Sequence, residues 1–169
     1  MRLCAVVGLG RLWADGHDVE SALRQNAADA RWRVREGVAM ALQLLGERDA
    51  AAWRAECISW AAGAPYVARA GIAGICEPRL LKEPASADAA VQACGIATAT
   101  LQAVAPARRR DDDTRVLRQA LGYCWSVAVA AAPEAGLPRF EALDTADSDV
   151  AWVVRENRKK ARLQRVLAR

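Results

Sequence analysis

The stretch Asp-Ala-Arg-Trp-Arg-Val-Arg-Glu at residues 29–36 returns 120 residues later as Asp-Val-Ala-Trp-Val-Val-Arg-Glu at residues 149–156. Five of the eight positions are identical. The shared residues are Asp29, Trp32, Val34, Arg35 and Glu36 in the first copy and Asp149, Trp152, Val154, Arg155 and Glu156 in the second. A match of this density, with a tryptophan in it, indicates that the chain contains an internal repeat.

Weaker copies lie between these two stretches. A shift of 83 residues aligns four positions in and just after the first copy, residues 29, 34, 35 and 38, with Asp112, Leu117, Arg118 and Leu121. A shift of 34 aligns residues 35 and 38 with Arg69 and Ile72. The arginines of the four copies, at positions 35, 69, 118 and 155, are therefore 34, 49 and 37 residues apart. This spacing is typical of repeats made of two helices.

Apolar residues recur at helical spacing through most of the chain, and alternating strand patterns are absent. In the first copy they form one stripe, which consists of Val34, Val38, Ala41, Leu42 and Leu45. Gly46 follows the stripe, and a glycine at that position favours the end of a helix. The periodicity predicts an all-α fold.

Further helical stretches are expected at residues 50–62, 66–81, 85–104, 114–132 and 149–167. Prolines stand near their edges, as residues that cannot donate a helical hydrogen bond should. These prolines are Pro65, Pro84, Pro106, Pro133 and Pro138. Pro78 falls inside the second stretch, where we expect a kink or a restart of the helix.

A turn aspartate followed by Val-Arg at the start of a helix resembles the pattern of HEAT repeats, and the resemblance covers residues 5–163 approximately. It implies a right-handed α-solenoid of antiparallel helix pairs in one domain over residues 1–169. We expect an unpaired first helix at residues 3–13 and pairs at 19–45, 50–81, 86–132 and 137–167. An unpaired first helix fits the C-terminal part of a longer array, or an apolar flank through which the chain self-associates.

The resemblance also implies that aspartates and arginines at repeated positions form a ladder between repeats. These positions are Asp29, Arg35, Arg69, Asp112, Arg118, Asp149 and Arg155. A structural role is favoured because an aspartate at a helix start caps free backbone N–H groups. Recognition of a ligand by the same residues is the alternative.

The chain contains six tryptophans and one phenylalanine, and the tryptophans can either pack in the core or contact a binding partner. We expect core positions, with Trp32 and Trp152 packed over the turns that precede them. The run of three arginines and three aspartates at residues 108–113 neutralises itself and predicts a solvated loop.

The formal net charge of +4 is concentrated at one end, because residues 149–169 hold seven Lys or Arg against two acidic residues, whereas residues 1–148 hold 17 against 18. On a helix over 149–167 the basic residues form one stripe, made of Arg155, Arg158, Lys159, Arg162, Arg165 and Arg169. A polar cap for the last repeat explains such a stripe. We favour this explanation only slightly over the alternative, a binding site for an anionic partner, because solubility does not require a single sign of charge.

Composition excludes several classes of protein. A hydrophobic fraction of 53% with 26% charged residues predicts a folded chain. Five cysteines without a CxxC pair and a single histidine, His17, argue against a disulfide framework and a zinc site, so we expect reduced core thiols and a cytoplasmic protein. Neither a signal peptide nor a membrane-spanning helix is expected.

The sequence contains no recognisable catalytic motif and implies no cofactor or metal. We therefore predict a non-catalytic interaction module that binds another protein. The alternative is a nucleic-acid-binding protein, because one group of bacterial DNA glycosylases for alkylated purines is similar in being built from HEAT-like repeats. That comparison concerns the fold, and it transfers no activity to this chain.

Overall fold

The computed structural model describes residues 2–168, and all the regular structure within them is helical, as the periodicity predicted. The α-helices are α1 (Arg2–Ala14), α2 (Glu20–Ala27), α3 (Trp32–Arg48), α4 (Ala50–Ala61), α5 (Pro65–Ile75), α6 (Pro84–Gln102), α7 (Asp112–Ala131), α8 (Pro133–Glu141), α9 (Ser148–Arg158) and α10 (Ala161–Leu167). Two short 3-10 turns, η1 (Pro78–Leu80) and η2 (Pro106–Arg108), precede α6 and α7.

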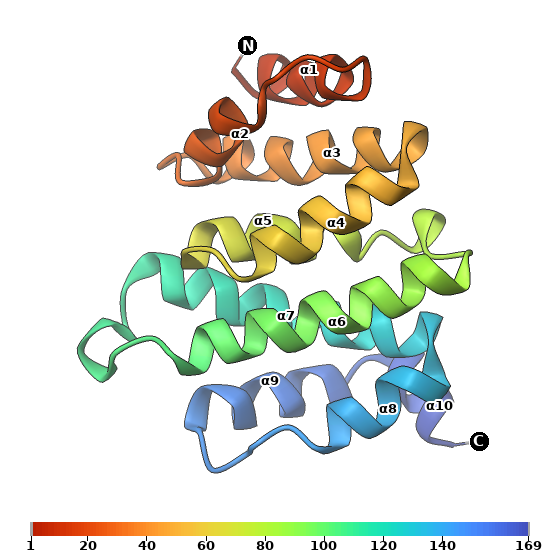
Figure 1. The fold of residues 1–169 in the computed structure, drawn as a ribbon. Helices are drawn as coiled ribbons and strands as arrows, with labels where there is room; N and C mark the ends of the chain where they lie inside the picture. Colours follow the sequence, from red (N-terminus) through yellow and green to blue (C-terminus); the bar gives the residue numbers. More distant parts are fainter. Residues whose placement is uncertain (1, 169) are drawn as a thin grey trace.

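The helices stack in two layers (Figure 1). In one layer α1, α3, α5, α7 and α9 each pack against the next. In the other, α4, α6 and α8 do the same, while α2 packs against α1, α3 and α5. Each helix of the second layer also packs on the helix that follows it in the chain, except that α8 packs on α7. The two ends of the chain therefore lie at opposite ends of the stack.

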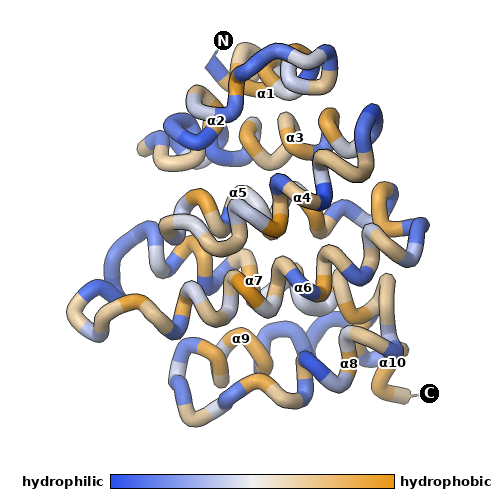
Figure 2. Tube along the Cα trace, viewed as in Figure 1, coloured by the Kyte–Doolittle hydropathy of each residue, from blue (hydrophilic) through white to orange (hydrophobic). Residues whose placement is uncertain are grey.

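The core lies between these layers. The α3 stripe predicted from the sequence is buried in full, and Leu42 at its centre is 0% exposed. Trp53, Trp60 and Trp125 are also completely buried. Figure 2 shows hydropathy alternating along the helices, as expected where one side of each helix faces the core.

Prolines begin several of the helical elements. Pro65, Pro84 and Pro133 begin α5, α6 and α8, and Pro78 begins η1 after α5 has ended, which confirms the expected restart. Pro138 was expected at a helix edge but lies inside α8. It removes the helical partner of the Glu134 carbonyl oxygen, and Glu134 is exposed, so water can satisfy that oxygen.

The expected single helix over residues 149–167 is wrong. α9 ends at Arg158 and α10 begins at Ala161, with Lys159 and Lys160 between them. α10 packs against α7 and α9, and its Leu163 is completely buried. A straight helix would carry Leu163 away from α7, so the break gains the burial of that side chain.

All five cysteines are free, and Cys57, Cys76, Cys94 and Cys124 are buried, as expected for core thiols. Cys4 is exposed, contrary to that expectation, because only Val6 and Gly10 of α1 are buried. Burial raises the pKa of the Cys57 thiol well above its usual value, which keeps it protonated and unreactive.

Within residues 2–168, no helix is long and apolar enough to cross a membrane, and no group of His, Cys, Asp and Glu could hold a metal ion.

Candidate interaction surface

The N-terminal turn of α3 is held by Arg35, which is 9% exposed. Its Nη1 donates hydrogen bonds to the carbonyl oxygens of Asp29 at 2.8 Å and Ala30 at 3.2 Å, and its guanidinium lies 5.0 Å from the ring centre of Tyr66. The expected ion pair with the Asp29 carboxylate is not formed. That carboxylate binds Arg31 instead, and the hydrogen bond holds the pKa of Asp29 well below its usual range.

The next links join α3, α5 and α7. Arg69 of α5 donates to the Arg35 carbonyl oxygen at 3.1 Å and binds the Glu36 carboxylate. Tyr66 of α5 donates its hydroxyl to Asp112 at the start of α7, at 2.7 Å. Burial and this hydrogen bond raise the pKa of Tyr66. Asp112 thus contacts the preceding helix of its layer through a tyrosine.

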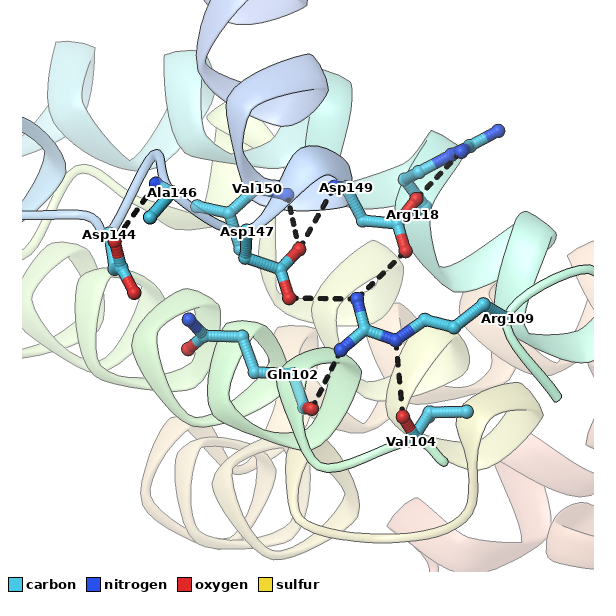
Figure 3. A network of polar contacts seen from close by, with 9 residues as sticks. All are labelled: Gln102, Val104, Arg109, Arg118, Asp144, Ala146, Asp147, Asp149 and Val150. Atoms are coloured by element: carbon cyan, nitrogen blue, oxygen red, sulfur yellow. Dashed lines mark hydrogen bonds and ion pairs between the residues drawn. The ribbon is translucent and has the colours of Figure 1, made fainter. Parts of the chain in front are cut away.

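Figure 3 shows the contacts that hold the start of α9. Arg118 of α7 donates to Asp149 at 2.7 Å, and its guanidinium lies 5.0 Å from the ring centre of Trp152. Arg109 donates to Asp147 at 2.8 Å and to Asp149 at 3.0 Å. Asp147 also caps α9, since it accepts the backbone N–H groups of Asp149 and Val150.

Arg109 therefore corrects the expectation of a solvated loop at residues 108–113. Its other nitrogens donate to the carbonyl oxygens of Gln102 at 2.9 Å and Val104 at 3.1 Å, so one guanidinium joins the end of α6 to the start of α9. The acidic partners of Arg109 are Asp147 and Asp149, almost 40 residues further along the chain. Because they are so distant in sequence, the run appeared to neutralise itself. Only Arg108 pairs with aspartates of its own run.

Two tryptophans of the repeated stretch differ in their surroundings. Trp152 is half-buried, and its ring lies against Gly122, where an added Cβ would come within 2.7 Å of it. Trp32 is 61% exposed, contrary to the expectation that it packs over its turn. It is the first residue of α3, where the Asp29 and Arg31 pair occupies the turn. Among residues 2–168, the one charged group that stacks on Trp32 is the neighbouring Arg33, at 5.2 Å from the ring centre.

Arg155 has a different environment from the other arginines at the repeated positions. It is exposed, and among residues 2–168 it has no carboxylate within ion-pair distance. It belongs to a group of basic residues on α9, α10 and the turn between them. This group, which we call the basic end, consists of Arg155, Arg158, Lys159, Lys160, Arg162 and Arg165. Arg169, which the sequence added to the stripe, lies outside the described residues.

The charges of the basic end are largely uncompensated. Within the described chain, Lys159 is the one member in an ion pair, with Glu156 at 2.7 Å, and its ammonium lowers the pKa of that carboxyl. Elsewhere most arginines are paired, for example Arg24 with Glu20 and Arg118 with Asp149. Because the members lie on two helices, they form a cluster around the end of the stack rather than the predicted single stripe.

An aromatic side chain lies against two members of the basic end. Tyr123 of α7 is 44% exposed, and its hydroxyl accepts a hydrogen bond from Arg162 at 2.8 Å. The Arg162 guanidinium lies 4.7 Å from the ring centre, and the Lys160 ammonium lies 5.9 Å from it. Sequence reasoning missed Tyr123 and Lys160, because no pattern connects α7 with a turn nearly 40 residues later.

Comparisons with protein-family profiles, curated proteins and solved structures find no match to this chain.

Proposed function

We propose that this chain is a right-handed HEAT-like α-solenoid that serves as a non-catalytic interaction module, and that it binds an acidic region of a partner protein through the basic end. The helix pairs α2/α3, α4/α5 and α6/α7 would be its repeats, with α1 unpaired and with α8 and α9, which both pack on α7, as the last unit. Arginines at equivalent positions near the starts of α3, α5 and α7 each contact another helix of their layer, since Arg35 lies over Tyr66 of α5, Arg69 binds α3 and Arg118 binds α9, and this supports the division.

The observation that carries the proposal is the concentration of unpaired positive charge at the basic end. Like charges held close together repel one another, so the arrangement costs free energy in the unbound protein. A polar cap would need only charges of mixed sign. An acidic partner would remove the repulsion, and the local positive potential would speed its association.

The test uses two variants that each lose three positive charges. Arg158→Gln/Lys159→Gln/Arg162→Gln changes the basic end, and Arg33→Gln/Arg110→Gln/Arg139→Gln changes three exposed arginines that lie elsewhere without a carboxylate partner in residues 2–168. Binding of a fluorescein-labelled glutamate-rich peptide is followed by anisotropy. We expect the first variant to lose at least about tenfold in affinity, and the control to stay within about twofold of wild type. Equal losses in both variants would mean that only net charge matters.

Nucleic-acid binding is the second candidate, and the exposed ring of Tyr123 beside Lys160 and Arg162 favours it, because bases stack on aromatic side chains next to cations. A salt titration with duplex and single-stranded DNA separates the two candidates. A phosphate-binding surface must lose affinity steeply with salt, and each lost phosphate contact should reduce the slope by about 1. Tight, salt-dependent DNA binding without binding of the acidic peptide would favour this second candidate.

A further inference from the structure

Beside the basic end the surface is hollowed between α7, α10 and the segment that follows α5. This hollow, which we call the α7–α10 groove, has a volume of about 390 Å³ and is lined by Pro78, Leu81, Val127, Ala130, Ala131 and Arg162. A second hollow of about 560 Å³ lies at the starts of α6 and α8, and Leu81 and Ala131 line both hollows.

The floor of the α7–α10 groove is apolar. Leu81 and Val127 are 5% and 3% exposed, so they close the bottom of the groove, and most of the apolar surface that a ligand can reach belongs to Pro78 and Ala130 at its rim. Five of its six lining residues carry no polar side-chain atom. A concave apolar surface of this kind gains most from an apolar side chain, because contact removes both surfaces from water.

Arg162 supplies the only charge of the groove lining, and it faces no acid in the described chain. Arg162 donates one hydrogen bond, from Nη2 to the neutral hydroxyl of Tyr123. Its Nη1 and Nε therefore have no protein acceptor within residues 2–168. An arginine with free donors beside an apolar floor complements a carboxylate that follows an apolar residue. The second hollow carries Asp88 and Glu134 as well as Lys82, so the excess of positive charge lies at the Arg162 side.

We propose that the α7–α10 groove binds a peptide segment of the partner in which an apolar side chain is flanked by acidic residues. The apolar side chain fills the groove between Leu81 and Val127, and the adjacent carboxylates meet Arg162 and the basic end. A nucleic acid would use the positive charge but leave the apolar floor uncovered, so this surface favours a peptide. The inference rests on the proposed function and adds the chemistry of the ligand to it.

The experiment compares three short fluorescein-labelled peptides: one rich in glutamate with two leucines, one with serines in place of these leucines, and one with lysines in place of the glutamates. We expect the first peptide to bind about tenfold more tightly than the second, because one leucine side chain is buried, and the third not to bind. Ala130→Glu places a charge at the groove rim, and Ala99→Glu, at an exposed position of α6, is its control. Ala130→Glu should reduce binding of the leucine peptide about tenfold, whereas Ala99→Glu should leave it within about twofold.

Equal affinity for the leucine and serine peptides, together with equal effects of Ala130→Glu and Ala99→Glu, would overturn the groove proposal. If the serine peptide still depended on Arg158, Lys159 and Arg162, the proposed function would remain. If no acidic peptide bound the wild-type protein, both proposals would fail together. Circular dichroism of each variant establishes that it is folded before its affinity is compared.

Discussion

Asn157→Leu tests how α9 is fastened to α7. The amide of Asn157 is completely buried and makes three hydrogen bonds. Its Oδ1 accepts the backbone N–H of Ser126 at 2.8 Å, and its Nδ2 donates to the carbonyl oxygens of Leu121 and Val153, both at 2.8 Å. Ser126 and Leu121 belong to α7 and Val153 to α9, so one side chain joins the backbones of two helices.

The expected cost follows from what leucine leaves behind. Leucine has the same branched arrangement of side-chain heavy atoms as asparagine, so no large cavity forms, but the backbone N–H of Ser126 and the carbonyl oxygen of Leu121 lose their hydrogen bonds to the amide. Ser126 and Leu121 lie inside α7, where each backbone group can also pair within the helix, so the loss is that of hydrogen bonds worth about 0.5–1.5 kcal/mol each. The three hydrogen bonds of the amide together predict a loss of about 2–4 kcal/mol in the free energy of unfolding.

Urea unfolding followed by circular dichroism measures this difference. Gln119→Leu is the matched control, since Gln119 is an exposed amide on α7, and it should change the free energy of unfolding by less than about 0.5 kcal/mol. Asn157→Asp keeps the acceptor of Ser126 and loses the donor to Leu121, and it also buries a charge, so it should destabilise as well. If Asn157→Leu were as stable as wild type, the amide would not hold α9 against α7.

Three further changes test other parts of the fold. Leu42→Ala should cost about 2–5 kcal/mol in urea unfolding, because Leu42 is completely buried against Gly74, and an unchanged midpoint would mean that the side chain faces water. Arg35→Met should lower the free energy of unfolding by about 1–3 kcal/mol, because it removes hydrogen bonds to two carbonyl oxygens. It should leave the affinity for the acidic peptide nearly unchanged. Lost binding with unaltered stability would contradict this structural role. The pKa of Asp147 is raised by burial, but Arg109 and two backbone N–H groups more than offset this and lower it overall. The stabilising contribution of the Asp147 carboxylate is therefore present above about pH 4 and is lost as the pH falls through the lowered pKa. The difference in melting temperature between wild type and Asp147→Asn should therefore shrink below about pH 4. A difference that stays constant would contradict the assignment.

The helical class and the α3 stripe could be predicted because they depend on local rules. Apolar residues at a period of 3.6 mark the buried side of a helix, and Pro65, Pro84 and Pro133 begin helices because they need no N–H partner there. These signals are contained in short windows of sequence. They require no knowledge of which helices are neighbours.

The break between α9 and α10 could not be predicted in this way. Helical periodicity continues through Lys159 and Lys160, and the break is stabilised by the burial of Leu163 after the chain turns back towards α7. Such a gain depends on tertiary packing, which overrides local helix propensity.

Only part of the candidate site could be predicted from the sequence. The excess of basic residues near the end of the chain is a property of composition, so the sequence identified Arg155, Arg158, Lys159, Arg162 and Arg165. Tyr123 and the α7–α10 groove could not be found, because they arise where α7 meets elements from distant parts of the chain. Arg109 was misjudged for the same reason, since its acidic partners lie before and at the start of α9.

The most direct test of the proposed binding surface is an amide NMR titration of the isotopically labelled protein with the leucine-containing acidic peptide. We predict that the largest chemical-shift changes occur at the basic end, at Tyr123 and along the groove residues Val127, Ala130 and Ala131, and that they are absent in Arg158→Gln/Lys159→Gln/Arg162→Gln. Shifts concentrated on the exposed side of α3, around Met40, would contradict the account, as would shifts that persist unchanged in the triple variant.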